Sequence, residues 1–187
     1  EGGQPQFLLG TDDQGRDVYS AILYGMQISL AIGVASVVLS IVLGVGLGLL
    51  SGYVGGRVDA FIMRVCDVML SFPAILVALL IDGVARAALP RESHSDVAYA
   101  VLVLAIALSG WVQYARTVRG STLVEKNKEY VQAARVIGVS PLAIMGKHVL
   151  PNVLGPVLVL GTVHVATAVL TEATLSFLGV GVPPTTP

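Results

Sequence analysis

The feature that most constrains this chain is an uninterrupted run without charge from Val18 to Gly56. A helix of about 20 apolar residues crosses the hydrocarbon of a bilayer, so residues 28–50 make one crossing with residues to spare. Of the 187 residues, 55% are hydrophobic and only 12% are charged, whereas a soluble domain has about 25% charged residues. A soluble core of this length could not hide so much apolar surface. The chain is therefore predicted to be an all-α membrane protein, a polytopic bundle of transmembrane helices.

Three further apolar segments are long enough to cross a bilayer, namely 58–84, 97–115 and 149–171. Pro73 lies inside the first of these and is expected to kink it. Four crossings are therefore predicted. Residues 1–25 are assigned to an extracytoplasmic or interfacial lead-in segment, and residues 26–187 to the membrane domain. The abrupt start and end of the chain lead us to expect further crossings before and after it.

The lead-in segment clusters turn-forming residues and carboxylates between positions 11 and 17. Asp13, Gly15 and Asp17 faintly resemble a calcium-binding loop, but the bidentate glutamate that such a loop needs is absent. A turn followed by an aspartate helix cap is favoured instead. Apolar residues then repeat every fourth position from Val18 to Met26, which predicts a short helix at the membrane surface.

Small residues recur every four positions through the first crossing: Ser36, Ser40, Gly44, Gly48, Gly52 and Gly56. Small side chains at this spacing let another helix approach closely in lipid, where packing drives association. Helix packing is assigned above all to four of them, Ser40, Gly44, Gly48 and Gly52. Four residues overshoot one helical turn by about 40°, so the stripe winds around the helix and is expected to face several neighbours in succession.

Arg64 and Asp67 lie near the start of the second predicted crossing, and Asp82 lies near its end. Asp67 is three residues from Arg64, which favours a local ion pair, the alternative being a carboxylate that lines a substrate path. Asp82, near the other end of the crossing, is expected at the membrane interface.

Aromatic and imidazole side chains lie in the third and fourth crossings. Trp111 and Tyr114 are predicted to be interfacial aromatics at one end of the third crossing. His164 lies alone in the middle of the fourth, without a second metal-ligating residue at suitable spacing. It is predicted to be a hydrogen-bonded packing residue.

Basic residues are distributed unevenly between the two sides of these crossings. One side holds eight of them: Arg57, Arg64, Arg116, Arg119, Lys126, Lys128, Arg135 and Lys147. The other side holds three: Arg16, Arg86 and Arg91. The positive-inside rule then places 51–58 and the long loop 116–148 in the cytoplasm, with 1–27, 86–96 and the C-terminus outside.

The long loop between the third and fourth crossings is predicted to hold short helices. Thr122 and Glu125 are interpreted as a capping box at the start of the first. Gly138 falls where a helix commonly ends with a left-handed residue. Ser140 and Pro141 then begin a second helix, with a hydroxyl cap and a proline in the first turn.

The same loop carries a family resemblance. It resembles the cytoplasmic signature loop of the permease subunits of bacterial ABC importers, whose pattern is Glu-Ala-Ala, three residues, Gly, nine residues, Ile, one residue, Leu-Pro. Five of the seven anchors match in register: Ala133, Ala134, Gly138, Leu150 and Pro151. Gln132 and His148 stand in place of the glutamate and the isoleucine. The run from Glu129 to Asn152 is more specifically similar to the peptide and nickel branch, and the resemblance extends over nearly the whole chain.

The resemblance implies the type-1 transmembrane (MetI-like) fold, with four of six crossings in this chain. It implies a multi-pass permease in the bacterial inner membrane that forms the translocation path with a second permease subunit, for peptides delivered by a substrate-binding protein. The loop would dock on an ATP-binding subunit, which uses the ATP, and the chain itself would bind no cofactor, metal or nucleic acid. The residues implied in docking are Glu129, Tyr130, Ala133, Ala134, Arg135, Gly138, Ser140, Pro141, Leu150 and Pro151.

Sequence motifs for catalysis are missing, which bears on the alternatives. Gly146-Lys147 lacks the rest of a nucleotide-binding loop, and neither a serine-hydrolase nor a zinc-protease motif occurs. An enzyme or a simple membrane anchor is therefore disfavoured, and any energy for transport must come from a partner. An ion-coupled carrier or channel subunit remains the main alternative, although paired membrane carboxylates and an inverted repeat are lacking. The cargo is not fixed by these features.

Overall fold

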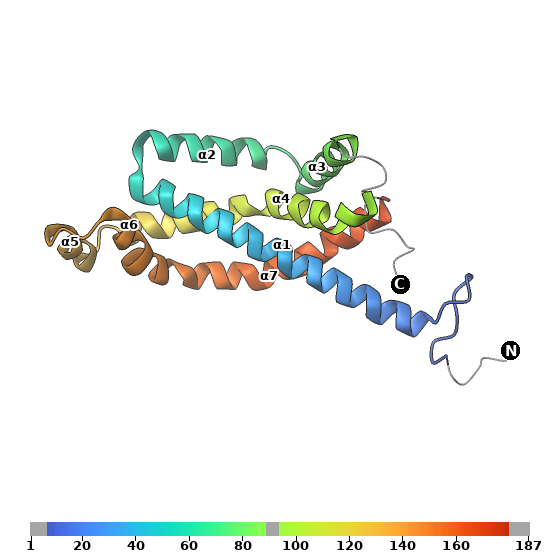
Figure 1. Cartoon of the computed structure of the whole chain (residues 1–187). Coiled ribbons are helices and arrows are strands. Elements are labelled where there is room, and N and C mark those ends of the chain that lie inside the picture. The colour runs from blue at the N-terminus through green and yellow to red at the C-terminus, as the bar shows by residue number, and fades with distance from the viewer. Residues whose placement is uncertain (1–6, 89–93, 180–187) are drawn as a thin grey trace.

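The computed structural model describes residues 7–88 and 94–179, and these are helical with no strand (Figure 1). The helices are α1 (Val18–Val54), α2 (Gly56–Leu70), α3 (Ala74–Ala88), α4 (His94–Glu125), α5 (Glu129–Val136), α6 (Pro141–Ala143) and α7 (Leu150–Phe177), with a π-helical turn, η2 (Ile144–Val149), between the last two. The all-α prediction is confirmed. The predictions for 89–93 and for the C-terminal end lie outside the described residues.

Helix α1 is a single helix of 37 residues that begins directly after its cap. The Asp17 carboxylate accepts hydrogen bonds from the backbone N–H groups of Tyr19 and Ser20, as expected for a helix cap. The separate surface helix predicted near Met26 is wrong, because no breaker interrupts the helix before Gly55. That glycine has a φ of +72° and Gly56 has a φ of +56°, a turn that residues with a side chain rarely adopt.

The second predicted crossing, 58–84, is broken rather than kinked. Helices α2 and α3 meet at an angle of 94° across the break at Ser71–Pro73. Pro73 lacks an N–H group and disfavours helical geometry in the residue before it, so it begins the next helix. Its carbonyl oxygen accepts from the backbone N–H groups of Leu76 and Val77.

Two further helices, besides α1, extend beyond the crossings predicted from hydropathy. Helix α4 runs to Glu125 instead of ending at 115, and α7 runs to Phe177 instead of 171. The predicted ends were set by the next charged residues, Arg116 and Glu172. A charged residue does not end a helix when ion-pair or hydrogen-bond partners lie within reach of its side chain. Arg116 forms an ion pair with Asp67 of α2, so the expected Asp67–Arg64 pair is also wrong.

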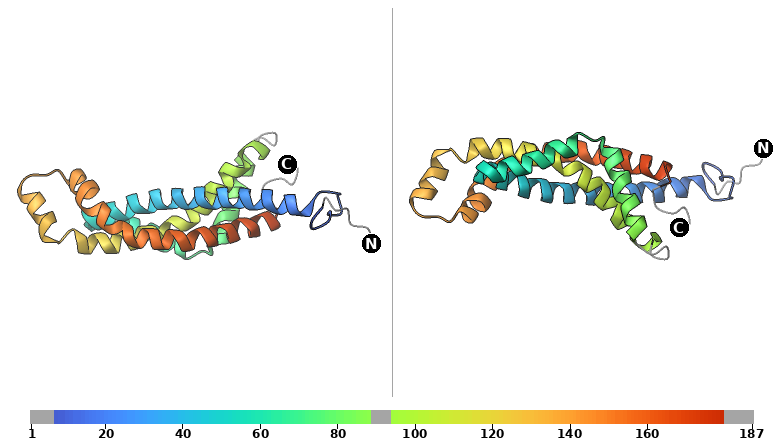
Figure 2. Two further views of the ribbon diagram at one scale, coloured as in Figure 1. Left: turned by 90° about the horizontal axis from the view of Figure 1, so that it is seen from below. Right: turned by 90° about the horizontal axis from the view of Figure 1, so that it is seen from above.

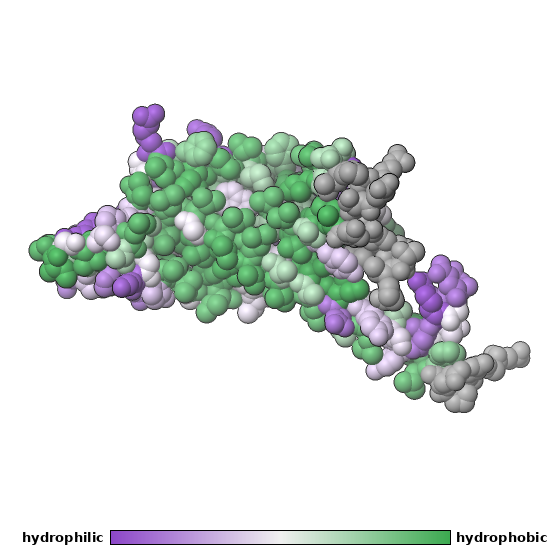
Figure 3. Space-filling view, in the orientation of Figure 1, coloured by the Kyte–Doolittle hydropathy of each residue, from purple (hydrophilic) through white to green (hydrophobic). Residues whose placement is uncertain are grey.

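The long helices lie side by side, with the loop at one end of the bundle (Figures 1 and 2). Helix α5 and the α1–α2 turn are at that end, and the lead-in segment and the end of α7 are at the opposite one. The surface in view is mostly apolar along the bundle and more polar at its ends (Figure 3). Three of the described helices are long and apolar enough to cross a membrane, and a fourth crossing exists if α2 and α3 cross as one broken span.

The small-residue stripe of α1 packs against α4 over three turns, so the expectation of several neighbours in succession is wrong for Ser40, Gly44, Gly48 and Gly52. A Cβ atom at Gly44 would lie 2.6 Å from the Trp111 carbonyl oxygen, and one at Gly48 would lie 2.4 Å from that of Ala115. At Gly52 it would lie 2.9 Å from the Arg119 carbonyl oxygen. Ser40 donates a hydrogen bond to the Ala107 carbonyl at 3.0 Å, extending the same contact. Small residues four positions apart on α1 therefore contact residues four positions apart on α4, which runs parallel to it. For this reason α4 stays in contact with the stripe as the stripe winds around α1.

Two aromatic side chains predicted at the membrane interface are instead buried in the bundle. Trp111 lies in a cluster with residues of α1 and α2, and it is 7% exposed. Tyr114 lies in a cluster with residues of α1 and α7, and it is 1% exposed. The Tyr114 hydroxyl lies 2.9 Å from Nδ1 of His164, which is therefore a hydrogen-bonded packing residue as predicted. Asp82 is also buried and pairs with Arg86 at 2.6 Å.

Candidate functional site

The loop after α4 is built as two short helical pieces joined through Gly138. This glycine has a φ of +83°, the left-handed conformation expected from the sequence. Ser140 then caps the second piece, its Oγ accepting from the Ala143 N–H at 3.4 Å, with Pro141 in the first turn. This second piece does not end before the last crossing. It continues through η2 into α7. The loop is therefore a helical hairpin, in which α5 forms one arm and α6 with η2 forms the other.

The π-helical turn η2 lies where Pro151 interrupts regular hydrogen bonding. A proline ring clashes with the carbonyl group four residues earlier, here that of Lys147. The backbone instead closes a wider turn, in which the Leu150 N–H donates to the Met145 carbonyl.

The residues assigned to docking divide between two faces of the hairpin. Ala134 is buried and Leu150 packs against the core formed with Val131, Val149 and Val153. The exposed residues are Glu129, Tyr130, Ala133, Arg135, Gly138, Ser140, Pro141 and Pro151. The hairpin is thus held to the bundle by its apolar side and presents its other side outward.

An apolar patch at the tip of this hairpin was not found from the sequence. Val136 is 87% exposed, and Ile137 and Leu142 are each 78% exposed. They surround Gly138, at the end of the molecule farthest from the lead-in segment. The signal in the sequence is three aliphatic residues inside an otherwise polar interval. We call Val136, Ile137 and Leu142 the tip patch.

Tyr130 joins α4, α5 and the start of α7. Its hydroxyl donates to the Glu125 carboxylate and lies 3.2 Å from the His148 carbonyl oxygen. The Asn152 amide donates to that hydroxyl at 3.0 Å and to the His148 carbonyl at 2.8 Å. Lys128 approaches the same carboxylate at 3.0 Å. Burial, and after it the Glu125 carboxylate, raise the pKa of Tyr130, so the hydroxyl keeps its proton at neutral pH. We call Glu125, Tyr130, His148 and Asn152 the clasp.

The clasp replaces the predicted capping box. Glu125 and Thr122 lie in the last turn of α4 rather than at the start of a new helix, so neither caps an N-terminus. Gln132, which departs from the family pattern, donates its side-chain amide to the Lys126 carbonyl at 3.4 Å. A glutamate there could not donate this bond.

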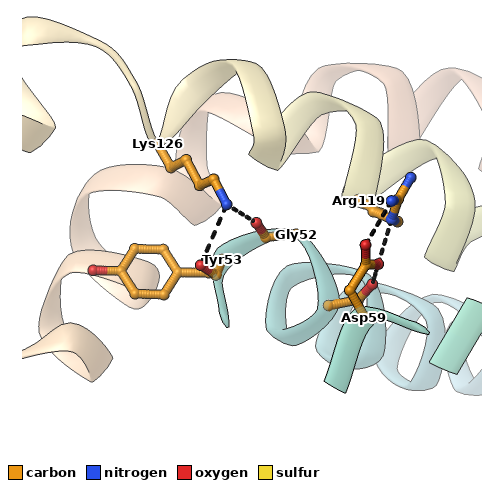
Figure 4. A network of polar contacts seen from close by, with 6 residues as sticks. Gly52, Tyr53, Asp59, Arg119 and Lys126 are labelled. Carbon is orange, nitrogen blue, oxygen red and sulfur yellow. Dashed lines mark hydrogen bonds and ion pairs between the residues drawn. The ribbon is translucent and has the colours of Figure 1, made fainter. Parts of the chain in front are cut away.

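A second set of polar contacts ties the end of α1 to α4 (Figure 4). Lys126 Nζ donates to the Gly52 carbonyl at 2.6 Å, which satisfies an acceptor at a helix C-terminus. Arg119 forms a two-pronged pair with Asp59 of α2, at 2.5 and 2.6 Å. The α1–α2 turn is therefore held against the last turns of α4.

The hairpin also contacts the end of α1, through Arg135 on its exposed face. The guanidinium carbon of Arg135 lies 5.3 Å from the ring centre of Tyr53, the residue next to Gly52. This is the distance of a cation–π contact. Helix α5 therefore contacts α1 through Arg135, and α4 and α7 through the clasp.

No group of three or more His, Cys, Asp or Glu side chains suited to a metal ion occurs within 7–88 and 94–179. Three carboxylates at this end of the bundle, those of Asp59, Asp67 and Glu125, are engaged with arginine, lysine or tyrosine partners.

Comparison with known proteins identifies the family. Residues 44–187 match the family described as the inner membrane component of binding-protein-dependent transport systems. The oligopeptide transport system permease protein OppC of Bacillus subtilis is 40% identical over 94% of this chain and 54% of its own length. The dipeptide transport system permease protein DppC of Haemophilus influenzae is 41% identical over 100% of this chain and 60% of its own.

A third relative, the glutathione transport system permease protein GsiD of Shigella flexneri, is 41% identical over 97% of this chain and 57% of its own length. The chain therefore spans somewhat more than half the length of these relatives. With a family match over most of the chain and three such relatives, the chain belongs to the family of inner membrane components of binding-protein-dependent transport systems.

Proposed function

We propose that this chain is the greater part of a permease subunit of an ATP-driven importer of peptides. In this proposal a second permease subunit completes the translocation path, a substrate-binding protein delivers the peptide, and separate ATP-binding subunits supply the energy. The hairpin formed by α5, α6 and η2 docks on an ATP-binding subunit in the cytoplasm. Peptide cargo is proposed because the relatives named above are permeases of oligopeptide, dipeptide and glutathione transport systems.

The tip patch is the observation that carries the docking proposal. Aliphatic side chains that are 78–87% exposed lie at the end of the bundle, on a loop whose other exposed residues are largely polar. An exposed apolar cluster outside the membrane belt is typical of a protein interaction site. Gly138 lies within the patch, and its φ of +83° turns the chain there.

The connections of the hairpin support its proposed mechanical role. Force applied to α5 reaches α1 through Arg135 and Tyr53, and reaches α4 and α7 through the clasp. These three helices form most of the bundle, so one docked hairpin can reorient them together. The membrane carboxylates do not favour the ion-coupled alternative. Asp67 and Asp82 pair with arginines, and Glu172 accepts from the Ser29 hydroxyl at 2.6 Å.

Docking is tested in the full-length subunit, co-expressed with its ATP-binding subunits and purified in detergent. The double variant Ile137→Gln, Leu142→Gln should insert and purify normally but lose the ATP-binding subunit. Val124→Gln is the matched control, because Val124 is 67% exposed in the last turn of α4, outside the tip patch. Retention of the ATP-binding subunit by the double variant, at the level of the control, would exclude the tip patch as the docking surface.

A further inference from the structure

A hollow of about 200 Å³ opens between the middle of α4 and the middle of α7. Its polar lining comes from Ser109 and Gln113 of α4 and from His164, Thr167 and Thr171 of α7. Among the described residues that line it, none is Asp, Glu, Lys or Arg. Neutral polar groups therefore gather half-way along two helices that are apolar enough to cross a bilayer.

The hydroxyl groups of the hollow are arranged as acceptors. Ser109 donates its proton to the Ile106 carbonyl at 2.8 Å, within its own helix. Thr167 and Thr171 likewise donate to carbonyl groups of α7, at 3.0 and 2.8 Å. With these protons engaged, the oxygen lone pairs of all three hydroxyls remain to accept hydrogen bonds from the hollow.

Gln113 differs, since its amide is exposed and finds no hydrogen-bond partner among the residues that the structure describes. A carboxamide that faces hydrocarbon without partners is costly, so such groups face protein or a water-filled cavity. Gly110 leaves space beside it for the imidazole of His164, whose Nε2 would lie 2.7 Å from a Cβ atom at that position. The hollow is thus shaped by the absence of a side chain and lined by donors and acceptors.

We propose that this hollow is part of the wall of the solute path and binds the neutral amide groups of a peptide. The proposal rests on the proposed function of the chain as a peptide permease. A glutamine amide offers one donor group and one acceptor, which complements the C=O and N–H of a peptide bond. The hydroxyl oxygens accept further N–H groups. Because the lining carries no charge, it recognises what all peptides share rather than their charged termini or side chains.

The size of the hollow fits a wall rather than a closed site. Enclosed ligand pockets measure about 300–1,000 Å³, whereas this hollow is smaller and open on one side. The peptide would be enclosed on its other side by protein beyond this chain.

The test uses the full-length complex in liposomes and a water-soluble, charged methanethiosulfonate as the thiol reagent. The background is Cys66→Ala, which removes the single cysteine of this sequence. Gln113→Cys should react. With trialanine present at ten times its Kd, the reaction should slow about tenfold, as for a site that ligand occupies. The control is Val159→Cys, because Val159 is 67% exposed on α7 and does not line the hollow. It should remain unreactive with or without peptide.

The outcomes separate this inference from the proposed function. If the Cys66→Ala complex takes up no trialanine, the peptide-permease proposal fails, and the inference fails with it. If it takes up trialanine but Gln113→Cys is inert, or reacts at the same rate with peptide present, only the inference is overturned. Inertness would place Gln113 against the second permease or in lipid.

A charge-introducing variant tests whether the wall contacts cargo directly. Gln113→Glu should raise the uptake of trilysine relative to triglutamate about tenfold, because a carboxylate in the path attracts cations and repels anions. Thr162→Glu is the control, since Thr162 is exposed on α7 but does not line the hollow. An unchanged ratio in Gln113→Glu, with normal ATP hydrolysis, would overturn the inference.

Discussion

Tyr130 shows how much a single hydroxyl group can connect. Its neighbours Glu125, His148 and Asn152 come from the end of α4, from η2 and from the start of α7. Tyr130→Phe keeps the ring but leaves the carboxylate and the amide without this partner. We expect a loss of about 1–2 kcal/mol in the free energy of unfolding. Thermal unfolding of the extracted full-length protein measures it.

Tyr24→Phe is the control for this variant, because Tyr24 is 60% exposed and should change little. The pH dependence gives a second check. The pKa of Tyr130 is raised in the folded protein, so its contribution is complete below about pH 10 and is lost as the pH rises further. Equal melting temperatures for the two variants would mean that the clasp does not contribute to stability.

A second prediction for a single residue concerns the substitution Gly138→Ala. Alanine there has free space, since nothing lies within 4 Å of its Cβ position, but it must adopt a φ of +83°. That costs about 1–2 kcal/mol and should re-aim the tip patch, so ATP hydrolysis continues with less transport. Gly146→Ala is the control, because that site is also open but helical. Transport per ATP in the reconstituted complex, unchanged by Gly138→Ala, would contradict a role for this turn.

At the scale of the helices, the contact between α1 and α4 depends on the absence of side chains. A Cβ atom at Gly48 would lie 2.4 Å from the Ala115 carbonyl oxygen and 2.9 Å from Val118 Cβ. Gly48→Ala should therefore destabilise the bundle by about 1–3 kcal/mol, the cost of overpacking. Gly46→Ala, two residues away with nothing within 4 Å, should be neutral or slightly stabilising.

The measurement for this pair is the melting temperature of the two variants, extracted in the same detergent. If the Gly48→Ala and Gly46→Ala variants have the same melting temperature, α1 and α4 are farther apart than the structure places them.

The break between α2 and α3 is a second feature at the scale of the helices. Pro73 lies at the break, the angle between α2 and α3 is 94°, and α3 packs against α4.

At the scale of the whole molecule, the two ends of the bundle should face opposite sides of the membrane. Asp13 lies in the lead-in segment and Val136 in the tip patch, at opposite ends of the molecule (Figure 2). In a Cys66→Ala background, Asp13→Cys should react with an impermeant thiol reagent in spheroplasts. Val136→Cys should react only after permeabilisation. Labelling of both from outside would rule out the orientation predicted from the basic residues.

Much of the candidate site could be predicted from the sequence because it depends on local properties. The left-handed turn at Gly138 and the Ser140–Pro141 helix start follow from the residues themselves. The tip patch and the clasp could not be predicted in this way. Whether Ile137 points outward, or Tyr130 meets Asn152, depends on how the hairpin folds back on the bundle.

The sequence by itself determined the membrane class, the positions of the apolar segments and the glycine turn at Gly138, because hydropathy and backbone freedom belong to individual residues. Only the tertiary structure decided where α4 ends and which side chains are buried. Arg116 meets Asp67 from 49 residues away, and Arg119 meets Asp59 from 60 residues away. Such partners stabilise charges that hydropathy treats as boundaries, and their proximity exists only once the helices have packed.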